Sequence, residues 1–512
     1  MDTHLFDLAI IGGGINGCGI ARDAAGRGLS VFLCEQNDLA NGTSSSSTKL
    51  IHGGLRYLEY YEFRLVREAL REREVLLNAA PHIIWPLRFI LPHHKGLRPA
   101  WLIRLGLFLY DNIGGRKLLP GTSSVNLLTD EAGVPLKGDF KKGFEYSDCW
   151  VMDSRLVILN AQDAASKGAD IRVRTKLISA KRSKGIWTLT ILDKNSNTES
   201  TVQAKALINA SGPWLDTLLP HISHTKTAQH IRMVKGSHII VDKLFDHNRA
   251  YIFQNDDGRI IFAIPFQNDF TLIGTTDVDF NGKPDEVEID STEISYLCEA
   301  ANEYFTTQIS PENVVYSYSG IRPLFDDGKS DAKAATRDYV LTLDTGDGDA
   351  PLLSIYGGKI TTYRKLAESV LKKLKDFLPQ TQAPWTETAN LPGGNFSPDA
   401  FKEEVQKLRL ACPFISDKHA TRLIRTYGTC AHDMSKHIQT PEELGTHFGH
   451  QLYSFEVDYL LSEEWAQTAE DVLFRRTKIG LFLNAEEVDQ LEEYINKKLQ
   501  VQENSSSITA KE

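Results

Sequence analysis

The first forty residues contain the pattern that most constrains the fold. A short apolar run, Leu8 to Ile11, ends at a cluster of glycines, of which Gly12, Gly14 and Gly17 have the G-x-G-x-x-G spacing. The first glycine permits a tight turn, the second lets a diphosphate approach the backbone, and the third lets the following helix pack close to the strand. The pattern predicts a parallel β-strand, a glycine turn and a helix that together bind a dinucleotide.

A second apolar strand, Ser30 to Cys34, leads to an acidic residue where ribose binding is expected. Glu35 lies 18 residues after Gly17, and a carboxylate at the end of this strand can bind the ribose hydroxyls. The glycine spacing alone is a weak signal, because glycines cluster in many loops. The strand, helix, second strand and acid together argue against an ordinary glycine-rich turn.

The size and charge of the chain limit its class. With 512 residues it exceeds what a single core usually supports, so two or three domains are expected. The formal charge of -10 gives no general attraction to nucleic acid. The six cysteines are widely spaced and lack a C-x-x-C pair, which is typical of reduced thiols. We expect no signal peptide, because the nucleotide-binding strand begins at once. We also expect no membrane-spanning helix, because the sequence contains no run of 18 apolar residues.

A segment rich in hydroxyl groups and glycine follows the second strand. Its four consecutive serines could indicate a linker, but it runs directly into Leu-Ile-His-Gly-Gly-Leu-Arg-Tyr. Hydroxyls and exposed amides just after a dinucleotide fold can instead bind a diphosphate and the edge of a flavin. We therefore expect cofactor contacts here from Thr43, Ser44, Ser47, His52, Gly53 and Gly54.

Patterns of strands and helices divide the rest of the chain. Strand–glycine–helix patterns occur again near residues 206 and 352. The sequence between these two positions has the alternating pattern of antiparallel strands. The sequence predicts an α/β fold with five parts: a Rossmann-like FAD-binding domain assembled from the discontinuous segments 1–80, 145–225 and 335–380; an insertion, 81–144; an antiparallel substrate-binding sheet, 226–334; a helical C-terminal domain, 388–500; and a disordered tail, 501–512.

Two segments have ambiguous surfaces. In the helix expected from Tyr61 to Asn78, charges at helical spacing, including Glu68 and Glu72, predict a solvated face. Pro99 to Tyr110 is apolar and aromatic, with cations on both sides. It could be a core helix with a basic rim, or it could lie in the headgroup plane of a membrane. The cations are Arg88, His93, His94, Lys95, Arg98, Arg104, Arg116 and Lys117.

Several long strings give the chain a family resemblance. The strings are Ile10–Gly17, Ser47–Glu59, Gly143–Trp150, Val234–His238, Ile273–Asp277, Tyr318–Leu324, Thr336–Tyr339 and Gly357–Glu368, and residues 475–480 also fit the pattern. With these strings the chain resembles the FAD-dependent, membrane-associated glycerol-3-phosphate dehydrogenases from Asp7 to about Asn484. We expect the bacterial form, without the calcium-binding extension of the mitochondrial relatives.

The resemblance implies a reaction, partners and a location. The enzyme would oxidise sn-glycerol 3-phosphate to dihydroxyacetone phosphate by hydride transfer to tightly but not covalently bound FAD. Ubiquinone or menaquinone would then take the electrons. We expect a peripheral protein on the cytoplasmic face of the inner membrane and in the cytoplasm, in contact with anionic lipid, with a homodimer possible and no metal. For such an enzyme the segment around residues 88–117 favours the membrane interpretation.

The reaction needs a phosphate clamp and a base. For the clamp we select Arg322, Arg56 and Lys359, because a dianionic phosphate needs convergent donors. The resemblance adds Tyr57 to this pocket, and Arg337 is a weaker candidate. An isolated arginine would more often form a surface ion pair.

For the base we select His238, because imidazole titrates near neutral pH. The alternative is a histidine satisfied in a strand core. His52 fits a cofactor loop better than the base.

Further cofactor contacts are expected at two strand ends. Gly357 and Gly358 open a helix whose N-terminus would direct amides at the flavin, where charge collects on reduction. The remaining contacts predicted are Asn16, Ala210, Gly212, Thr361 and Thr362.

The sequence fits four other functions less well. A glycerol-3-phosphate oxidase that makes hydrogen peroxide from oxygen would have the same pocket, and only the apolar segment favours quinone. An amino-acid oxidase would need a carboxylate clamp instead of three cations. A non-catalytic nucleotide-binding protein would not need a base together with cations. A soluble NAD-dependent enzyme would not need site residues spread over 350 positions.

Overall fold

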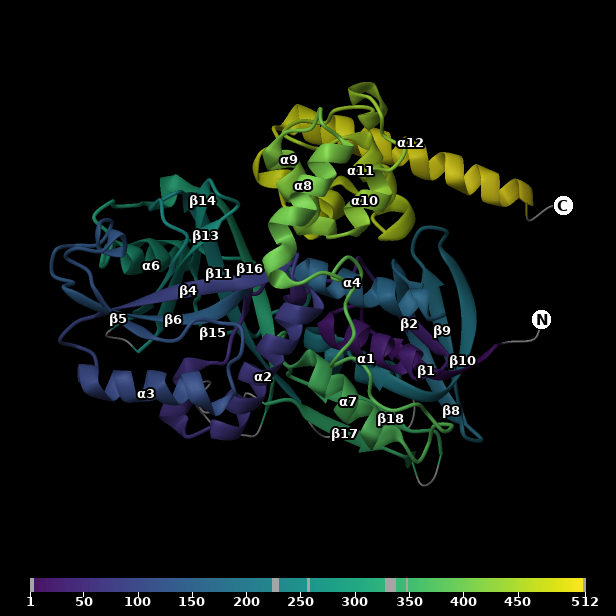
Figure 1. The fold of residues 1–512 in the computed structure, drawn as a ribbon. Coiled ribbons are helices and arrows are strands. Elements are labelled where there is room, and N and C mark those ends of the chain that lie inside the picture. Colours follow the sequence, from purple (N-terminus) through teal and green to yellow (C-terminus); the bar gives the residue numbers. More distant parts are fainter. Residues whose placement is uncertain (1–3, 223–229, 256–257, 327–337, 347–348, 510–512) are drawn as a thin grey trace.

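The computed structural model describes residues 4–222, 230–255, 258–326, 338–346 and 349–509. Figure 1 shows two β-sheets side by side, with a bundle of helices formed by the C-terminal part of the chain above them. One sheet is mostly parallel and the other mostly antiparallel. This mixed α/β architecture, with a helical C-terminal domain, is the predicted fold class.

The first sheet is that of the nucleotide-binding domain. Its central strands are parallel, and β17 adds an antiparallel edge. A hairpin of β8 (Thr175–Ser183) and β9 (Ile186–Asp193) continues from β10. The order along the sheet is β17 (Val340–Asp344), β18 (Leu352–Tyr356), β10 (Thr198–Asn209), β1 (Leu5–Ile11), β2 (Val31–Cys34) and β7 (Asp170–Arg172).

Strand β1 is buried on both faces. Leu8 and Ile10 belong to a core shared with four helices, whereas Ala9 and Ile11 belong to a second core with the β8–β9 hairpin. Since side chains alternate along a strand, the continuous apolar run serves two layers. The four helices are α1 (Ile15–Gly26), α2 (Phe63–Ala79), α4 (Asp153–Ser166) and α7 (Tyr363–Leu374).

The second sheet is larger than the predicted substrate domain. Its pairs are antiparallel except for β12 and β4, which run parallel. Helix α6 (Ser291–Asn302) packs on one face, and β16 (Val314–Phe325) pairs with β11. The order is β15 (Val278–Asp279), β11 (Ile231–Asp242), β14 (Phe270–Gly274), β13 (Ile260–Phe266), β12 (Ala250–Gln254), β4 (Ile84–His93), β6 (Lys142–Val151) and β3 (Leu50–Ile51).

The predicted insertion, residues 81–144, is woven into this second sheet. It supplies β4, β5 (Ser123–Asn126) and the start of β6. The predicted start of a nucleotide-binding segment at residue 145 is wrong, because residue 145 lies inside β6 and β6 belongs to the second sheet. Strand periodicity alone could not show which sheet a strand joins, because both sheets bury apolar strands.

The helix of the apolar segment lies at the surface. Helix α3 (Ala100–Ile113) forms the lower edge of the second-sheet side in Figure 1. Leu107 and Tyr110 are buried beside α2 (Phe63–Ala79), but Trp101 is 69% and Phe108 is 59% exposed. Arg88, predicted as part of a basic rim, turns inward to Glu145 at 2.8 Å. No described helix is long and apolar enough to cross a membrane.

The C-terminal helices have a core of their own. They are α8 (Phe401–Ala411), α9 (Asp417–Tyr427), α10 (Cys430–Ser435), α11 (Ser454–Glu463) and α12 (Ala485–Thr509). The prediction of a disordered tail from residue 501 is wrong as far as Thr509, because α12 continues to that residue. The helix projects from the bundle (Figure 1). No glycine or proline interrupts this stretch, so nothing stops the helix there. Residues 510–512 lie outside the described residues.

Helix α2 has a less solvated face than predicted. Glu72 is buried, and its carboxylate accepts two hydrogen bonds from the Arg364 guanidinium of α7, at 2.6 and 2.8 Å. Both side chains are 2% exposed. This two-point ion pair therefore joins α2 to the nucleotide-binding domain.

Replacing Glu72 tests this connection. Glu72→Gln removes one charge of a buried pair, which costs about 3 kcal/mol, although Glu368 still contacts Arg364. We expect the melting temperature of the holoenzyme to fall by several degrees. Glu68→Gln, at a half-buried position one turn earlier, should leave it within one degree. Equal shifts for the two variants would contradict this role of Glu72.

Candidate active site

A long cavity of about 580 Å³ runs between the two sheets. It begins at the carboxyl ends of β1 and β2 and is also lined by residues 210–212, directly after β10, and by parts of β8, β11 and β16. Ligands bind at this edge of parallel sheets. Thirteen of the predicted cofactor residues line it: Gly12, Gly14, Asn16, Glu35, Thr43, Ser44, Ser47, His52, Ala210, Gly212, Gly357, Gly358 and Thr361.

The glycine turn is packed too closely for any side chain. Gly12 has φ +114°, and a Cβ there would lie 2.5 Å from the carbonyl oxygen of Ala210. A Cβ on Gly17 would lie 2.0 Å from the carbonyl oxygen of Gly12. Gly17 therefore allows α1 to pack against the turn at Gly12, and it does not itself line the cavity.

The acidic residue after β2 faces the cavity. The Glu35 carboxylate accepts hydrogen bonds from the N–H groups of Gly13 at 2.7 Å and Asn37 at 2.8 Å. Burial raises the pKa of Glu35, and the Gly13 N–H partly offsets this. These two amides fix the carboxylate at the mouth of the glycine turn, as expected for an acceptor of ribose hydroxyls.

The hydroxyl-rich segment is only partly directed at the cavity. Ser44 Oγ accepts a hydrogen bond from the N–H of Ile15 at 3.0 Å, which ties the segment to the start of α1. Ser47 lines the cavity, but its Oγ donates to Asp153 at 2.8 Å and accepts a hydrogen bond from the N–H of Lys49 at 2.9 Å. Its hydroxyl is therefore already engaged within the protein.

The segments around His52 and Gly357 meet. The N–H of His52 donates to Thr361 Oγ1 at 3.3 Å, and Asn16 Nδ2 donates to the Gly357 carbonyl at 3.1 Å. Two predicted contacts, Gly53 and Thr362, line neither this cavity nor the smaller one beside it. The Gly53 N–H instead donates to Tyr110 and Asp148, and Thr362 is buried at the start of α7.

The donors around the cavity fit a dinucleotide with a flavin. Bare glycines leave room for the backbone to approach a diphosphate, and Glu35 stands at the ribose position. The buried Oδ1 of Asn16 has no hydrogen-bond partner within the described part of the chain, although this residue lines the cavity. A cofactor that occupies the cavity would lie beside this acceptor.

His238 lies in the same cavity, on β11. It is 2% exposed, stacks on Tyr318 with ring centroids 4.8 Å apart, and places Nε2 2.9 Å from Thr48 Oγ1. Burial lowers the pKa of His238 well below its ordinary value, and the charges of Lys49 and Arg322 lower it further. The imidazole is therefore neutral at pH 7 and able to accept a proton.

The predicted cations converge on the same region. Arg322 lines the long cavity together with a smaller neighbouring cavity of about 220 Å³, and it donates to Asp277 at 3.0 Å. Lys359 Nζ lies 4.1 Å from the centroid of the Tyr57 ring. Arg56 lines the smaller cavity and donates to the Gly258 carbonyl at 2.8 Å. Arg337 lies outside the described residues.

Three residues in the site had no predicted role. Thr48 bonds His238, Asp277 bonds Arg322, and Arg259 lines the smaller cavity. The first two lie in strings on which the resemblance rests, so their positions in those strings were the available signal. No signal singled out Arg259, because only the fold brings its strand to the cavity.

Comparison with known proteins identifies the family. The profile described as FAD dependent oxidoreductase matches residues 7–364. The chain belongs to this family. A second profile, the C-terminal domain of alpha-glycerophosphate oxidase, matches residues 384–504. The cofactor is FAD, and the protein is an oxidoreductase.

Curated relatives match almost the whole chain. A D-erythritol 1-phosphate dehydrogenase of Brucella abortus is 52% identical and covers 94% of this chain and 96% of its own length. A glycerol-3-phosphate dehydrogenase of Pseudomonas aeruginosa is 50% identical, over 96% and 95%. The aerobic glycerol-3-phosphate dehydrogenase of Escherichia coli is 48% identical, over 96% and 97%.

A solved structure has the same fold over most of its length. The glycerol-3-phosphate dehydrogenase from Bacillus halodurans, complexed with FAD, superposes with a TM-score of 0.77 at 27% identity. The match covers 97% of this chain and 91% of that one. The FAD in that complex agrees with the family assignment of the cofactor.

Proposed function

We propose that the protein oxidises sn-glycerol 3-phosphate to dihydroxyacetone phosphate and passes the electrons to a membrane quinone. The observation that carries this proposal is a neutral, buried histidine in the same cavity as cations suited to a phosphate. The names of the relatives from Pseudomonas aeruginosa and Escherichia coli support the substrate. The proposal adds the roles of individual residues and the electron acceptor.

The chain's residues would hold the substrate at both ends. Arg322, Arg56 and Lys359 supply charged donors for the phosphate, with Tyr57 between the two cavities. Nε2 of His238 accepts the proton of the secondary hydroxyl, and the Thr48 hydroxyl that contacts it can rotate aside or pass the proton on. FAD supplies the hydride acceptor.

Two other activities remain as specific alternatives. The relative from Brucella abortus is named for D-erythritol 1-phosphate, a phosphate of a longer polyol, and is 52% identical. The second alternative is a glycerol-3-phosphate oxidase that reduces oxygen to hydrogen peroxide. The exposed apolar face of α3 supports quinone instead, because a quinone-linked enzyme must reach lipid.

The membrane part of the proposal rests on α3. Trp101, Leu105, Phe108 and Leu109 are exposed on it, and Tyr61 nearby is 80% exposed. The cations Lys95, Arg98, Arg104, Arg116 and Lys117 are exposed around this face. Exposed aromatics ringed by cations suit peripheral insertion among anionic headgroups. We propose that this membrane surface is the cytoplasmic face of the inner membrane.

Anaerobic flavin reduction tests the substrate. We expect glycerol 3-phosphate to bleach the flavin absorbance of the purified holoenzyme faster than D-erythritol 1-phosphate at equal concentration. Reoxidation should be faster with a soluble quinone than with dissolved oxygen. If D-erythritol 1-phosphate bleached the flavin faster, it would be the better candidate substrate. If oxygen reoxidised the flavin as fast as the quinone does, the quinone would be rejected as the specific acceptor.

The depressed pKa of His238 predicts the pH profile. Because the base must be neutral and its pKa lies well below 6.5, the rate of flavin reduction at saturating substrate should hold its plateau as pH falls through 6.5. A histidine of ordinary pKa would already be half protonated there. His238→Asn should slow the reduction by ~10² or more at neutral pH with FAD still bound. A loss below threefold would reject His238 as the base.

Charge substitutions on α3 test the membrane contact. Trp101→Glu with Phe108→Glu should lower binding to vesicles that contain anionic lipid by about tenfold or more in flotation, because acids oppose insertion. Activity with a soluble quinone should be retained. Leu410→Glu is the matched control, since Leu410 is 83% exposed on α8. Equal binding of all three proteins would contradict the role of α3.

A further inference from the structure

The segment from residue 36 to residue 49 forms much of one wall of the long cavity. It connects β2 of the first sheet to β3 of the second, and nine of its residues between Gln36 and Thr48 line the cavity. It also carries Thr48, which contacts His238. Whatever holds this segment in place therefore shapes the FAD site.

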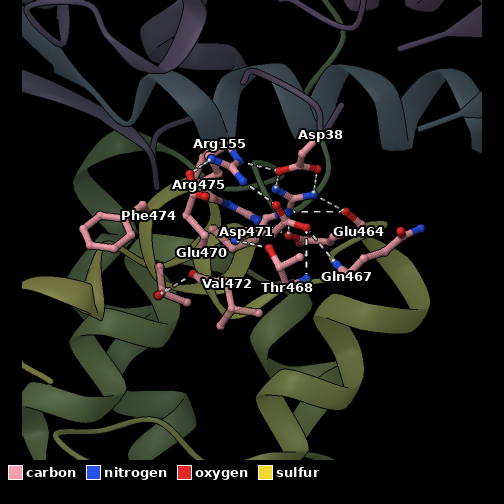
Figure 2. A network of polar contacts seen from close by, with 12 residues as sticks. Asp38, Arg155, Glu464, Gln467, Thr468, Glu470, Asp471, Val472, Phe474 and Arg475 are labelled. Atoms are coloured by element: carbon pink, nitrogen blue, oxygen red, sulfur yellow. Dashed lines mark hydrogen bonds and ion pairs between the residues drawn. The ribbon is translucent and has the colours of Figure 1, made fainter. Parts of the chain in front are cut away.

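One end of the segment is anchored by a buried carboxylate. Asp38 is fully buried, and its oxygens accept hydrogen bonds from Arg475 Nε at 2.6 Å and from Arg476 Nη1 and Nη2 at 2.7 and 2.8 Å. Figure 2 shows Asp38 directed down into this cluster. Among the described residues, all hydrogen bonds to this carboxylate come from the C-terminal domain.

Asp38 can stay buried only because its charge is paired. A buried carboxylate is strongly unfavourable unless it is paired and hydrogen-bonded. Without Arg475 and Arg476, the segment around Asp38 would have to move so that the carboxylate reached water or another partner. The conformation of a segment in the FAD-binding domain therefore depends on a different domain.

The two arginines are themselves held firmly. They end a π-helical turn, Asp471–Arg476, a rare geometry that is often found at functional sites. Arg475 also contacts Asp471, which accepts hydrogen bonds from Arg174 of the first domain at 2.8 and 3.0 Å. Burial would raise the pKa of Asp471, but Arg475, Arg174 and Arg476 together lower it to about 2, so it stays charged.

The other end of the segment is held within the FAD-binding domain itself. Lys49 Nζ donates to Asp153 of α4 and to the Ser45 carbonyl, both at 2.9 Å. The C-terminal domain acts on the opposite end, at Asp38.

We propose that the C-terminal helical domain is a structural part of the FAD site. Arg475 and Arg476 act as positioning residues: they bind Asp38 and so hold residues 36–49 in the conformation that contacts the cofactor. The inference concerns FAD retention, so it is independent of the proposed substrate and acceptor. A simple domain anchor would stabilise the interface without changing FAD affinity.

Variants at the contact between Arg476 and Asp38 distinguish positioning of the FAD-binding segment from simple anchoring of the domain. Arg476→Gln removes the two-point contact with Asp38, and Arg476→Lys is a milder variant that keeps the charge. Arg425→Gln is the matched control. Arg425 is a partly buried arginine of the C-terminal domain, and it faces the Pro81 and His82 carbonyls and the Trp85 ring, not residues 36–49.

The measurement is FAD affinity of the full chain. The dissociation constant is obtained by titrating apoprotein with FAD and following flavin fluorescence, at a temperature where circular dichroism shows every variant folded. We expect Arg476→Gln to weaken binding by about tenfold or more, equivalent to ~1.4 kcal/mol, and Arg476→Lys by less. Arg425→Gln should change it less than twofold. FAD affinity unchanged in both Arg476 variants, or lowered equally by Arg425→Gln, would overturn the proposal.

The wild-type protein provides a second test that needs no substitution. If the domain helps to hold FAD, then FAD must help to hold the domain, because coupling between two equilibria is reciprocal. Residues 379–398 connect α7 of the FAD-binding domain to α8 of the C-terminal domain. Removing FAD should speed proteolytic cleavage within this connection by about tenfold. Cleavage at the same rate with and without FAD would also count against the inference, even if a variant failed to fold.

Discussion

The close approach of strand ends at one edge of the first sheet is the constraint on which the site depends. β1 and β10 meet so tightly that Gly12 leaves no room for a side chain against Ala210. The Asn16 side chain then reaches the turn at Gly357, 341 residues away in sequence. Three distant segments are thereby held around one cavity. The shape of the FAD site therefore depends on the bare glycine at position 12 and on the Asn16 side chain that bridges to Gly357.

Around this frame, charge decides what the cavity can do. Cations from β16 and from the turn before α7 lie near a histidine that burial keeps neutral. A neutral imidazole and a set of fixed positive charges are compatible in one small space, because the charges of Lys49 and Arg322 add to burial in lowering the pKa of His238. His238 is buried against Tyr318, and Arg322 is paired with Asp277. The proposed phosphate binding and proton removal both depend on this combination.

Buried ion pairs connect the parts of the molecule. Arg364 joins α7 to Glu72 of α2, and Arg155 of α4 pairs with Glu464 of the C-terminal domain. Such pairs add little net stability compared with apolar packing, but they are costly to break because a lone charge would remain buried. They therefore fix how the parts fit together. Asp38 belongs to the same class and places this dependence directly beside the cofactor.

The sequence by itself determined the nucleotide-binding strand and turn, the helical C-terminal region and the residue types of the site. These features are local: glycine spacing, apolar runs and hydroxyl clusters act over a few residues. Only the tertiary structure decided that β4 and β6 join the second sheet, that Glu72 is buried and that Asp38 is bound by Arg475 and Arg476. A charged residue looks the same in sequence whether it meets water or a partner 400 residues away, because burial depends on what the rest of the chain packs against it.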